Sequence, residues 1–477
     1  MSRLVIVSNR VTPASAEGAP AGGLAVGLKA ALESARGLWF GWSGDVCPDD
    51  VSMRDTRQID DGDDSYRSVT VDLTQSQYAG YYEQFANRGL WPLLHGRLDL
   101  TTFTRRDFAT YREVNRLFCE CLLPELGPDD IIWVQDYHLF LFSHHLRNKG
   151  VEAALGFFLH TPFPPADLFV ALPCWREIVD GLLAHDVVGF HTRGDLRNFA
   201  DVIERKLNGR VSGDGAVELG EHRCALVAQS IGIDTDAFAA MAASEAERGG
   251  GEQFADWITN RKVIVGVDRL DYSKGLDHRF RAFETFLAES PEHRGGVAFL
   301  QIAAPSREDV PEYVQMREEL EALSGRINGR FTELDWVPLR YINKSFPQES
   351  LAVLYRLSRA GLVTPLRDGL NMVAKEYIAA QDPDDPGVLV LSQFAGAAEE
   401  LEEALIVNPY DEAGVADTIK RAVEMPRDER RRRHQTLFER LSANTVHDWC
   451  GRFVDRLHAV ETHRRGRSMT GGAIGQD

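Results

Sequence analysis

Short apolar runs alternate with helix-length amphipathic segments along the whole chain, and this alternation restricts the fold more than any other feature. It is typical of α/β proteins, in which buried parallel strands are joined by helices. The expected strands in the first half are Leu4–Val7, Gly37–Gly41, Val69–Val71, Ile131–Val134, Ala154–Leu159, Val187–Phe190 and Cys224–Val227. Those in the second half are Val263–Val267, Val297–Ile302, Thr332–Asp335, Gly361–Val363, Val388–Leu391 and Leu405–Val407. The expected helices include Phe108–Leu123, Leu196–Leu207, Leu276–Glu289, Val310–Gly325 and Leu351–Ser358.

The chain is too long for a single hydrophobic core. A length of 477 residues suggests two large domains. The passage from Ile231 to the acidic, glycine-rich Glu245–Gly251 places the boundary near residue 230. We therefore predict two Rossmann-like parallel-sheet domains that face a central cleft, over 1–230 and 231–445, with a disordered tail over 463–477.

Composition and charge exclude several classes of function. The hydrophobic content of 44% and charged content of 26% are typical of a soluble globular protein. A net charge of −19 argues against a nucleic-acid partner or an anionic membrane, so an anionic substrate needs a local cluster of cations. Leu4–Val7 is too short for a signal-peptide core, and the six cysteines show no CxxC pair. We expect a cytoplasmic protein with reduced thiols.

The segment Val267–Gly275 is the strongest pointer to chemistry. Arg269 and Lys274 directly follow an apolar run and precede the helix expected from Leu276. In open α/β sheets, ligands bind outside the carboxyl ends of the strands. An arginine fork and a lysine point charge on such a turn suit a diphosphate.

The first expected strand is followed by a second possible anion site. Arg10 stands at the carboxyl end of the strand, and Gly22-Gly23 precedes a helical pattern that begins at Leu24. Glycines at a helix start let backbone amides approach an anion. Taken alone, the glycine pair fits an ordinary loop better, because neither GxGxxG nor a P-loop is present.

Two consecutive strands of the first half are followed by polar residues that are able to act in binding or catalysis. Asp136 and His138 follow Ile131–Val134, and His160 follows Ala154–Leu159. A single histidine at such a place is usually structural. Because both groups follow the carboxyl ends of neighbouring strands, we expect them over the same edge of one sheet.

The stretch from Pro365 to Glu376 is similar to a sugar-nucleotide loop. Asp368 lies on an expected turn, and Asn371 opens a helix whose first-turn amides, near Met372 and Val373, suit phosphate. Glu376 lies about two turns further on, where a carboxylate can bind a ribose diol.

The motif Asp234-Thr-Asp236 formally matches the DxD of metal-dependent sugar transferases. It stands where a helix N-cap is expected, and capping explains it better. We predict no essential metal.

Together these stretches resemble the trehalose-6-phosphate synthase family of retaining glucosyltransferases. The resemblance covers most of the chain, to about Tyr410. It is carried, in order, by Arg3–Arg10, Gly37–Gly44, Tyr81–Phe85, Leu90–Pro92, the Arg269/Lys274 segment, Arg326–Gly329 and Leu391–Ala398.

The resemblance implies a two-Rossmann architecture of GT-B type, with a C-terminal helix over 446–462 that crosses back to the first domain. It assigns acceptor contacts to Arg10, Tyr82, Trp91, Asp136 and Arg307. It assigns donor contacts to Gly22, Gly23, His160, Arg269, Lys274, Phe346, Asp368, Asn371, Met372, Val373 and Glu376. The residues expected to act in catalysis are Asp136, His160, Arg269 and Lys274.

The implied reaction transfers glucose from UDP-glucose to glucose 6-phosphate with retention of configuration, without metal or cofactor, in trehalose biosynthesis and osmoprotection. The expected assembly is a homo-oligomer, a dimer or a tetramer, with no nucleic-acid or membrane partner. Gln135, His191 and Asp268 depart from the family's usual His, Gln and Glu.

Two other functions remain open at the level of sequence. A glucosylglycerol-phosphate synthase would use glycerol 3-phosphate, and the aromatic pair Tyr82/Trp91 favours a ring-sized acceptor instead. A non-catalytic sugar-phosphate-binding regulator would not need Arg269, Lys274, Asp368 and Glu376 all intact. The nucleobase of the donor is not fixed by the sequence.

Overall fold

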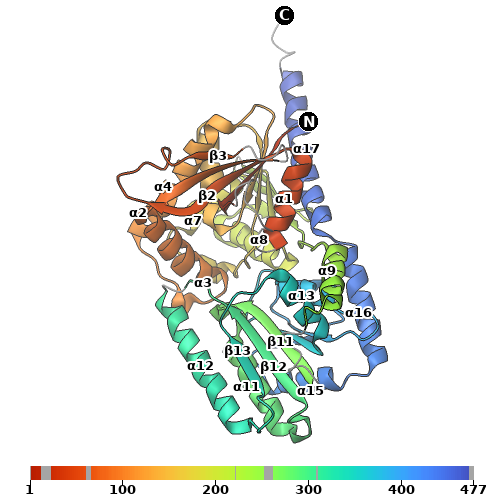
Figure 1. Ribbon diagram of the computed structural model, residues 1–477. Coiled ribbons are helices and arrows are strands. Elements are labelled where there is room, and N and C mark those ends of the chain that lie inside the picture. Colours follow the sequence, from red (N-terminus) through yellow and green to blue (C-terminus); the bar gives the residue numbers. More distant parts are fainter. Residues whose placement is uncertain are drawn as a thin grey trace, which may run out of the picture. The chain divides into compact units, whose positions relative to one another are not determined.

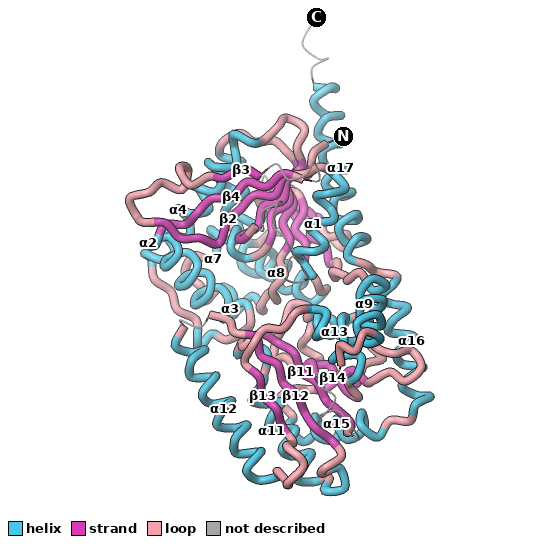
Figure 2. The backbone as a smooth tube through the Cα atoms, in the orientation of Figure 1, coloured by secondary structure: helices cyan, strands magenta, loops and turns pink. Residues whose placement is uncertain are grey.

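The computed structural model describes residues 2–11, 23–60, 66–220, 222–251, 261–307 and 310–471. Within it the chain forms two compact units: unit 1 comprises Met1–Ile231 with Val446–Asp477, and unit 2 comprises Gly232–Thr445 (Figure 1). Each unit contains one sheet with helices around it, as the magenta strands in Figure 2 show. The predicted α/β class with two parallel-sheet domains is confirmed.

The described part of unit 1 has a ten-stranded sheet in the order β3-β4-β2-β1-β5-β6-β7-β10-β9-β8. The strands from β4 to β10 are parallel, whereas β3, β9 and β8 pair antiparallel at the two ends. The bounds are β1 Leu4–Arg10, β2 Leu38–Cys47, β3 Gln58–Asp60, β4 Arg67–Thr74, β5 Ile131–Gln135, β6 Ala154–Phe158, β7 Val187–Phe190, β8 Arg210–Val211, β9 Ala216–Leu219 and β10 His222–Ala228. Every strand expected from the first half is present. The short β3, β8 and β9 were not foreseen because they carry no continuous apolar run.

The helices of unit 1 follow the amphipathic segments. Their bounds are α1 Gly23–Ala35, α2 Gln75–Gln77, α3 Trp91–Leu94, α4 Arg105–Leu122, α5 Phe142–Asn148, α6 Ala166–Phe169, α7 Trp175–Leu183, α8 Arg193–Leu207 and α17 Val446–Gly471. Shorter or wider turns are the π-helix η1 Tyr78–Leu90 and the 3-10 helices η2 Leu98–Leu100, η3 Leu123–Glu125 and η4 Tyr137–Leu139. Capping explains where the long ones begin, since the Thr104 and Thr192 hydroxyls accept bonds from backbone amides of α4 and α8.

The last helix, α17, belongs to unit 1 and runs beside α1 (Figure 1). Trp449 and Phe453 pack on Trp133 of β5, with ring centroids 4.9 and 4.6 Å away. Gly156 of β6 makes room for them, because a Cβ there would lie 2.6 Å from Cε1 of Phe453. A buried aromatic cluster thus attaches the end of the chain to the first sheet.

The expectation of a disordered tail from residue 463 is wrong, since α17 continues to Gly471. The Arg464 guanidinium donates to Asp186 over 2.5 Å and to the carbonyl oxygen of Ala153 over 2.9 Å. These bonds hold the helix beyond the point where its apolar contacts end. The rest of the predicted tail, 472–477, lies outside the described residues.

Unit 2 has, over its described residues, a six-stranded parallel sheet in the order β13-β12-β11-β14-β15-β16. The strands are β11 Lys262–Arg269, β12 Val297–Ala304, β13 Leu339–Ile342, β14 Ala360–Val363, β15 Val388–Ser392 and β16 Leu405–Val407. The helices are α9 Thr235–Glu247, α11 Leu276–Glu289, α12 Pro311–Phe331, α13 Gln348–Leu357, α14 Met372–Ala380, α15 Glu412–Glu424 and α16 Arg427–Ser442, with 3-10 helices η5 Tyr272–Lys274, η6 Pro291–His293 and η7 Gly396–Glu399. A buried core joins β11, β12, β14 and β15 to α11, α12 and α15.

One predicted strand of unit 2 is wrong. Thr332–Asp335 follows α12 as a tight turn, in which Glu333 and Trp336 exchange backbone hydrogen bonds of 3.0 and 3.2 Å. The Trp336 indole donates to the carbonyl oxygen of Val297 over 2.8 Å. That bond holds the turn against β12. The next strand, β13, begins only at Leu339.

Asp234 has the role expected for it. Its side chain accepts a hydrogen bond from the Ala237 amide and caps α9, which supports the capping interpretation of Asp234-Thr-Asp236.

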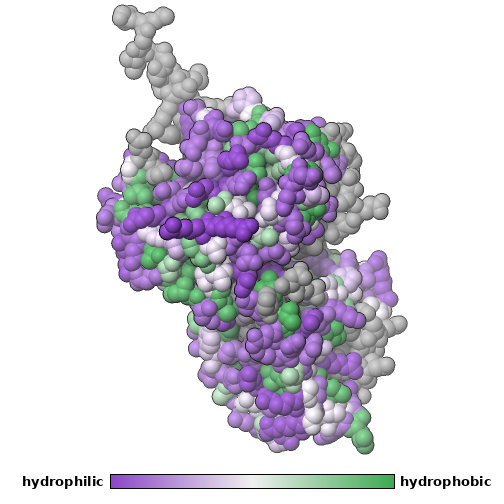
Figure 3. Space-filling model, turned by 90° about the vertical axis from the view of Figure 1, so that its left-hand side faces the viewer, coloured by the Kyte–Doolittle hydropathy of each residue, from purple (hydrophilic) through white to green (hydrophobic). Residues whose placement is uncertain are grey.

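Hydrophilic residues cover most of the face in Figure 3, and the hydrophobic residues lie between them in small groups. Among the helices of the described ranges, none has the length and apolarity that a bilayer span requires.

Candidate active site

The predicted donor cations of unit 2 lie at the carboxyl end of β11. Arg269 is the exposed last residue of the strand, and Lys274 ends the 3-10 turn η5. Gly275 then adopts a φ of 63°, and α11 begins at Leu276. A side chain at Gly275 would also meet Leu366, whose Cδ2 would lie 2.9 Å from the added Cβ. The strand, turn and helix predicted around these cations are confirmed.

Lys274 lies next to the second predicted donor segment. Its ammonium forms an ion pair with Asp368, and both side chains are nearly buried, at 11% and 13% exposure. Asn371 donates to the same carboxylate over 3.1 Å and caps α14 by accepting from the Ala374 amide. Three predicted donor residues from distant parts of the sequence therefore meet at the carboxyl ends of β11 and β14.

The first turns of α14 carry the other predicted donor groups. Met372 and Val373 belong to the first turn of this helix. In any α-helix the backbone amides of the first turn have no carbonyl partner within the helix, so they suit an anion. Burial raises the pKa of Glu376, one turn further, to about 7, although a hydrogen bond with Gln348 opposes the shift. Phe346 is half-buried just before α13.

Arg307, the predicted acceptor cation of unit 2, follows β12 in the left-handed region, with φ 52°. Its guanidinium forms an ion pair of 2.7 Å with Asp271 and a hydrogen bond of 2.5 Å with the Tyr313 hydroxyl. Asp271 is fully buried and also caps the turn that carries Lys274.

A buried arginine binds several residues near the carboxyl ends of the strands of unit 2. Arg279 of α11 donates to Asp268 over 2.6 Å, to Gln301 over 2.8 Å and to Thr364 over 2.9 Å. It also donates to the backbone oxygen of Lys274 over 3.4 Å. Neither Arg279 nor Asp271 was singled out from the sequence. Each had a signal in the sequence. Arg279 is a charged residue on the apolar stripe of a helix, and Asp271 stands two residues before Ser273, as a capping residue does.

In unit 1, Asp136 and His160 follow β5 and β6 as predicted. The Asp136 carboxylate accepts from the His160 amide over 3.2 Å, and Asp136 has a φ of 70°. The His160 ring contacts Gln135 and His191, at 2.9 Å from Nε2 and 3.1 Å from Nδ1. Two of the three departures from the family pattern thus touch His160 directly.

The His160 imidazole is enclosed by rings. Those of Phe158, His191 and Trp449 lie 5.0, 5.1 and 5.9 Å from it, centroid to centroid. Burial lowers the pKa of His160 to about 3. The ring is therefore neutral near pH 7 and cannot serve as a charged acid, and both of its nitrogens have protein partners, Gln135 and His191.

Aromatic residues form most of the remaining predicted acceptor site. Tyr82 stacks on His138 at 5.8 Å and lies against Trp42 at 5.5 Å. Trp91 is buried against Tyr137 at 5.7 Å, and Tyr137 in turn contacts His138 at 4.0 Å. Tyr82 and Trp91 are therefore the two ends of one series of rings.

The glycine site near the first helix is only partly described. Arg10 is exposed at the end of β1, and its guanidinium lies against Gly44, where a Cβ would be 2.6 Å from Nη2. Gly44 has a φ of 102°, so that close approach and the backbone both favour glycine. Gly23 begins α1, whereas Gly22 lies outside the described residues. An anion site at the glycine pair stays a prediction.

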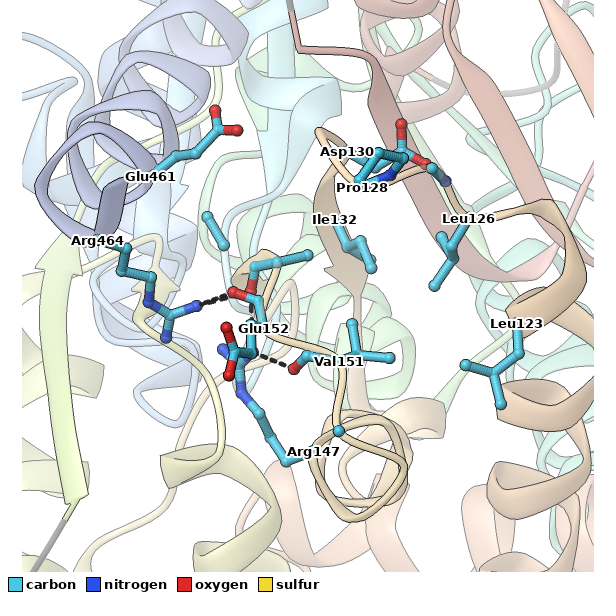
Figure 4. Close-up of a pocket in the computed structure, with 14 residues that line it drawn as sticks. Leu123, Leu126, Pro128, Asp130, Ile132, Arg147, Val151, Glu152, Glu461 and Arg464 are labelled. Atoms are coloured by element: carbon cyan, nitrogen blue, oxygen red, sulfur yellow. Dashed lines mark hydrogen bonds between the residues drawn. The ribbon is translucent and has the colours of Figure 1, made fainter. Parts of the chain in front are cut away.

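A cavity of about 950 Å³ in unit 1 lies at the opposite edge of the sheet, where β5 and β6 begin (Figure 4). No predicted site residue lines it. Arg147 and Arg464 extend towards it, and both form ion pairs with Asp186, at 2.9 and 2.5 Å. Ligands of open α/β sheets bind outside the carboxyl ends of the strands, so we place the candidate site at the carboxyl edge instead.

Two parallel-sheet α/β units with cations at strand ends have the architecture of a glycosyltransferase of GT-B type, and the solved structures that the chain matches are of that type. The chain belongs to glycosyltransferase family 20, and the model of that family matches residues 3–459. It is 48% identical over 461 residues to the trehalose-6-phosphate synthase of Sinorhizobium fredii, which covers 96% of this chain and 99% of the relative.

Solved structures show the same likeness. A UDP-forming α,α-trehalose-phosphate synthase from Burkholderia xenovorans in complex with glucose-6-phosphate has a TM-score of 0.91 and 46% identity, over 96% of this chain and 100% of that one. A structure from E. coli bound with UDP-2-fluoro glucose has a TM-score of 0.89 and 43% identity, over 96% and 99%. The predicted family, fold type and enzyme class are confirmed.

Proposed function

We propose that the protein transfers glucose from UDP-glucose to glucose 6-phosphate, giving α,α-trehalose 6-phosphate and UDP with retention of configuration and without a metal. The cluster of Lys274, Asp368 and Asn371 at the carboxyl ends of β11 and β14 is the observation that carries the proposal. Relatives at 43–48% identity that are named for this reaction, or that hold its two ligands, support the same substrates.

The departing diphosphate gains negative charge as the glycosidic bond breaks. Arg269, Lys274 and the first-turn amides of α14 supply fixed positive charge for it. Asp368 holds the Lys274 ammonium in place, so little reorganisation is needed during the reaction. One such preorganised donor contributes ~3 kcal/mol, or ~100-fold in rate.

The bond changes balance without a protein nucleophile. The anomeric oxygen of glucose 6-phosphate forms a bond to C1 of the donor glucose, the bond from C1 to the diphosphate oxygen breaks, and the hydroxyl proton moves to the departing phosphate. Asp136 orients the acceptor, and the neutral His160 bonds a hydroxyl of the donor's glucose by exchanging one of its ring partners, Gln135 or His191, for the sugar.

Acceptor selection rests on charge and shape. Arg10 and Arg307 bind the 6-phosphate, and the rings from Tyr82 to Trp91 flank the sugar. An arginine fork bonds two phosphate oxygens at once, and free glucose cannot form these bonds, so the site favours glucose 6-phosphate.

The decisive experiment offers UDP-, ADP- and GDP-glucose with glucose 6-phosphate or glycerol 3-phosphate and identifies each product by NMR. We expect the pair of UDP-glucose and glucose 6-phosphate to give α,α-trehalose 6-phosphate, with equal rates in the presence of EDTA. Preference for glycerol 3-phosphate, or binding of both ligands without turnover, would replace the proposal by one of the other two functions. A homo-oligomer and a cytoplasmic location also stay predictions, and sedimentation equilibrium tests the first.

A further inference from the structure

We infer that Asp271 is a positioning residue for both phosphate-binding cations of unit 2: one carboxylate oxygen bonds Arg307, and the other caps the turn that carries Lys274. This inference rests on the proposed function, because it takes Arg307 as the acceptor cation and Lys274 as a donor cation. The two cations lie on different segments, after β12 and after β11, and Asp271 bonds to both segments.

The first arm reaches Arg307. Oδ2 of Asp271 accepts from Nη1 of Arg307 over 2.7 Å and from the Tyr313 hydroxyl over 3.0 Å. The Arg307–Tyr313 bond of 2.5 Å closes a three-residue ring of hydrogen bonds. The Asp271 side chain is 0% exposed and that of Arg307 only 8%, so removing the carboxylate leaves a nearly buried cation without its counter-charge.

The second arm reaches the turn of Lys274. Oδ1 of Asp271 accepts from the Ser273 amide over 2.9 Å, and its backbone oxygen accepts from the Lys274 amide over 3.1 Å. This is an N-cap, which fixes the direction in which the short helix η5 starts. The cap therefore determines where the Lys274 side chain begins its path to Asp368.

The backbone at Arg307 shows why an anchor is needed. A φ of 52° is unfavourable for an arginine, and such a conformation persists only where the surroundings enforce it. The ion pair with Asp271 and the contact of the guanidinium with the Tyr313 ring, at 5.5 Å, supply that enforcement. Without the anchor, the segment is free to relax and carry the guanidinium away from its position.

Two substitutions at the same position separate the arms. Asp271→Ser keeps a side-chain oxygen that caps well but is too short to reach Arg307, whereas Asp271→Ala removes both arms. We expect Asp271→Ser to raise the KM for glucose 6-phosphate roughly 10-fold and to change the Kd of UDP, measured by calorimetry without acceptor, by less than about twofold. Asp271→Ala should raise the KM similarly and also weaken UDP binding by roughly fivefold.

Tyr313→Phe is the matched control, since it removes one hydroxyl from the first arm and leaves the cap intact. It should raise only the KM for glucose 6-phosphate, by roughly threefold. Circular dichroism and melting curves check that each variant is folded, and Tyr313→Phe tests the first arm even where Asp271→Ala fails to fold.

The inference is overturned if Asp271→Ser weakens UDP binding as much as Asp271→Ala does, or if neither substitution changes the KM for glucose 6-phosphate. A purely structural Asp271 would lower the melting temperature and leave both substrate constants unchanged. The proposed function fails separately, since it is lost only if the unsubstituted protein forms no trehalose 6-phosphate.

Discussion

The carboxyl edges of the sheets in the two units carry different kinds of side chain. In unit 1, the polar groups at the ends of β5 and β6 lie among rings, and burial keeps His160 neutral at physiological pH. In unit 2, the ends of β11, β12 and β14 carry ion pairs, Lys274 with Asp368 and Arg307 with Asp271. The edge of unit 1 offers aromatic shape with few charged groups, Arg10 and Asp136, and the edge of unit 2 offers ion-paired cations.

The difference follows from what each edge is proposed to do. A diphosphate that departs with growing charge is stabilised most by preorganised cations in a poorly hydrated site. A sugar ring is positioned by aromatic faces and hydrogen bonds, which need no net charge. Lys274 and Arg307 are each held by a carboxylate, so the position of both cations is fixed before a ligand binds.

The largest expected effect is at the charged edge. Lys274→Ala should lower the rate of UDP release by ~100-fold or more, because one preorganised donor to the leaving group is lost. The melting temperature should change little. Lys262→Ala is the control, since Lys262 begins the same strand and its ammonium donates to the backbone oxygen of Val423 over 3.0 Å. Near-normal UDP release by Lys274→Ala would remove the contrast between the edges.

A smaller effect is expected at the aromatic edge of unit 1. Asp136→Asn keeps a residue type that tolerates the φ of 70° but removes the charge that orients the acceptor. We expect kcat/KM for glucose 6-phosphate to fall roughly 30-fold, as for a lost charge-assisted hydrogen bond, with the Kd of UDP unchanged. Equal losses for acceptor and donor would show that Asp136 also belongs to the donor site.

A pH series sharpens the comparison further. Because the pKa of Glu376 is raised to about 7, its carboxylate form grows between pH 6 and 8. If that form binds the ribose diol, the KM for UDP-glucose falls roughly fivefold over this range. Glu376→Gln should have a higher KM that no longer depends on pH. A pH dependence that survives this substitution assigns the titration to another group.

The smallest effect is expected far from both edges, where α17 ends. Arg464→Ala should lower the free energy of unfolding by about 1 kcal/mol or less, because Arg464 is 38% exposed and Asp186 keeps its ion pair with Arg147. Chemical denaturation measures the loss, and the kinetic constants should not change. A change in kcat would connect the cavity edge of unit 1 to the reaction.

Much of the fold was predictable because a parallel strand buried on both faces is a continuous apolar run. Val263–Val267 and Val297–Ile302 are such runs, and their neighbours Arg269 and Lys274 follow from the topology of α/β sheets. Thr332–Asp335 failed because a four-residue segment with one apolar side chain carries too little pattern. Leu334 itself is fully exposed on the turn.

The supporting network of the site was not predictable from one sequence. Asp271 and Arg307 are 36 residues apart, and Lys274 and Asp368 are 94 apart. No local periodicity encodes such pairs, because they form only when neighbouring strands bring their ends together. The sequence indicated which cations stand at strand ends, and the structure supplied the carboxylates that hold them.

The most direct test of the central claim is a crystal structure of the protein with UDP bound. We expect the diphosphate oxygens within hydrogen-bonding distance of Arg269 and Lys274, at the carboxyl end of β11 and beside the first turn of α14. A nucleotide whose phosphates lie away from both side chains would contradict the proposed reaction site and the division of roles between the two edges.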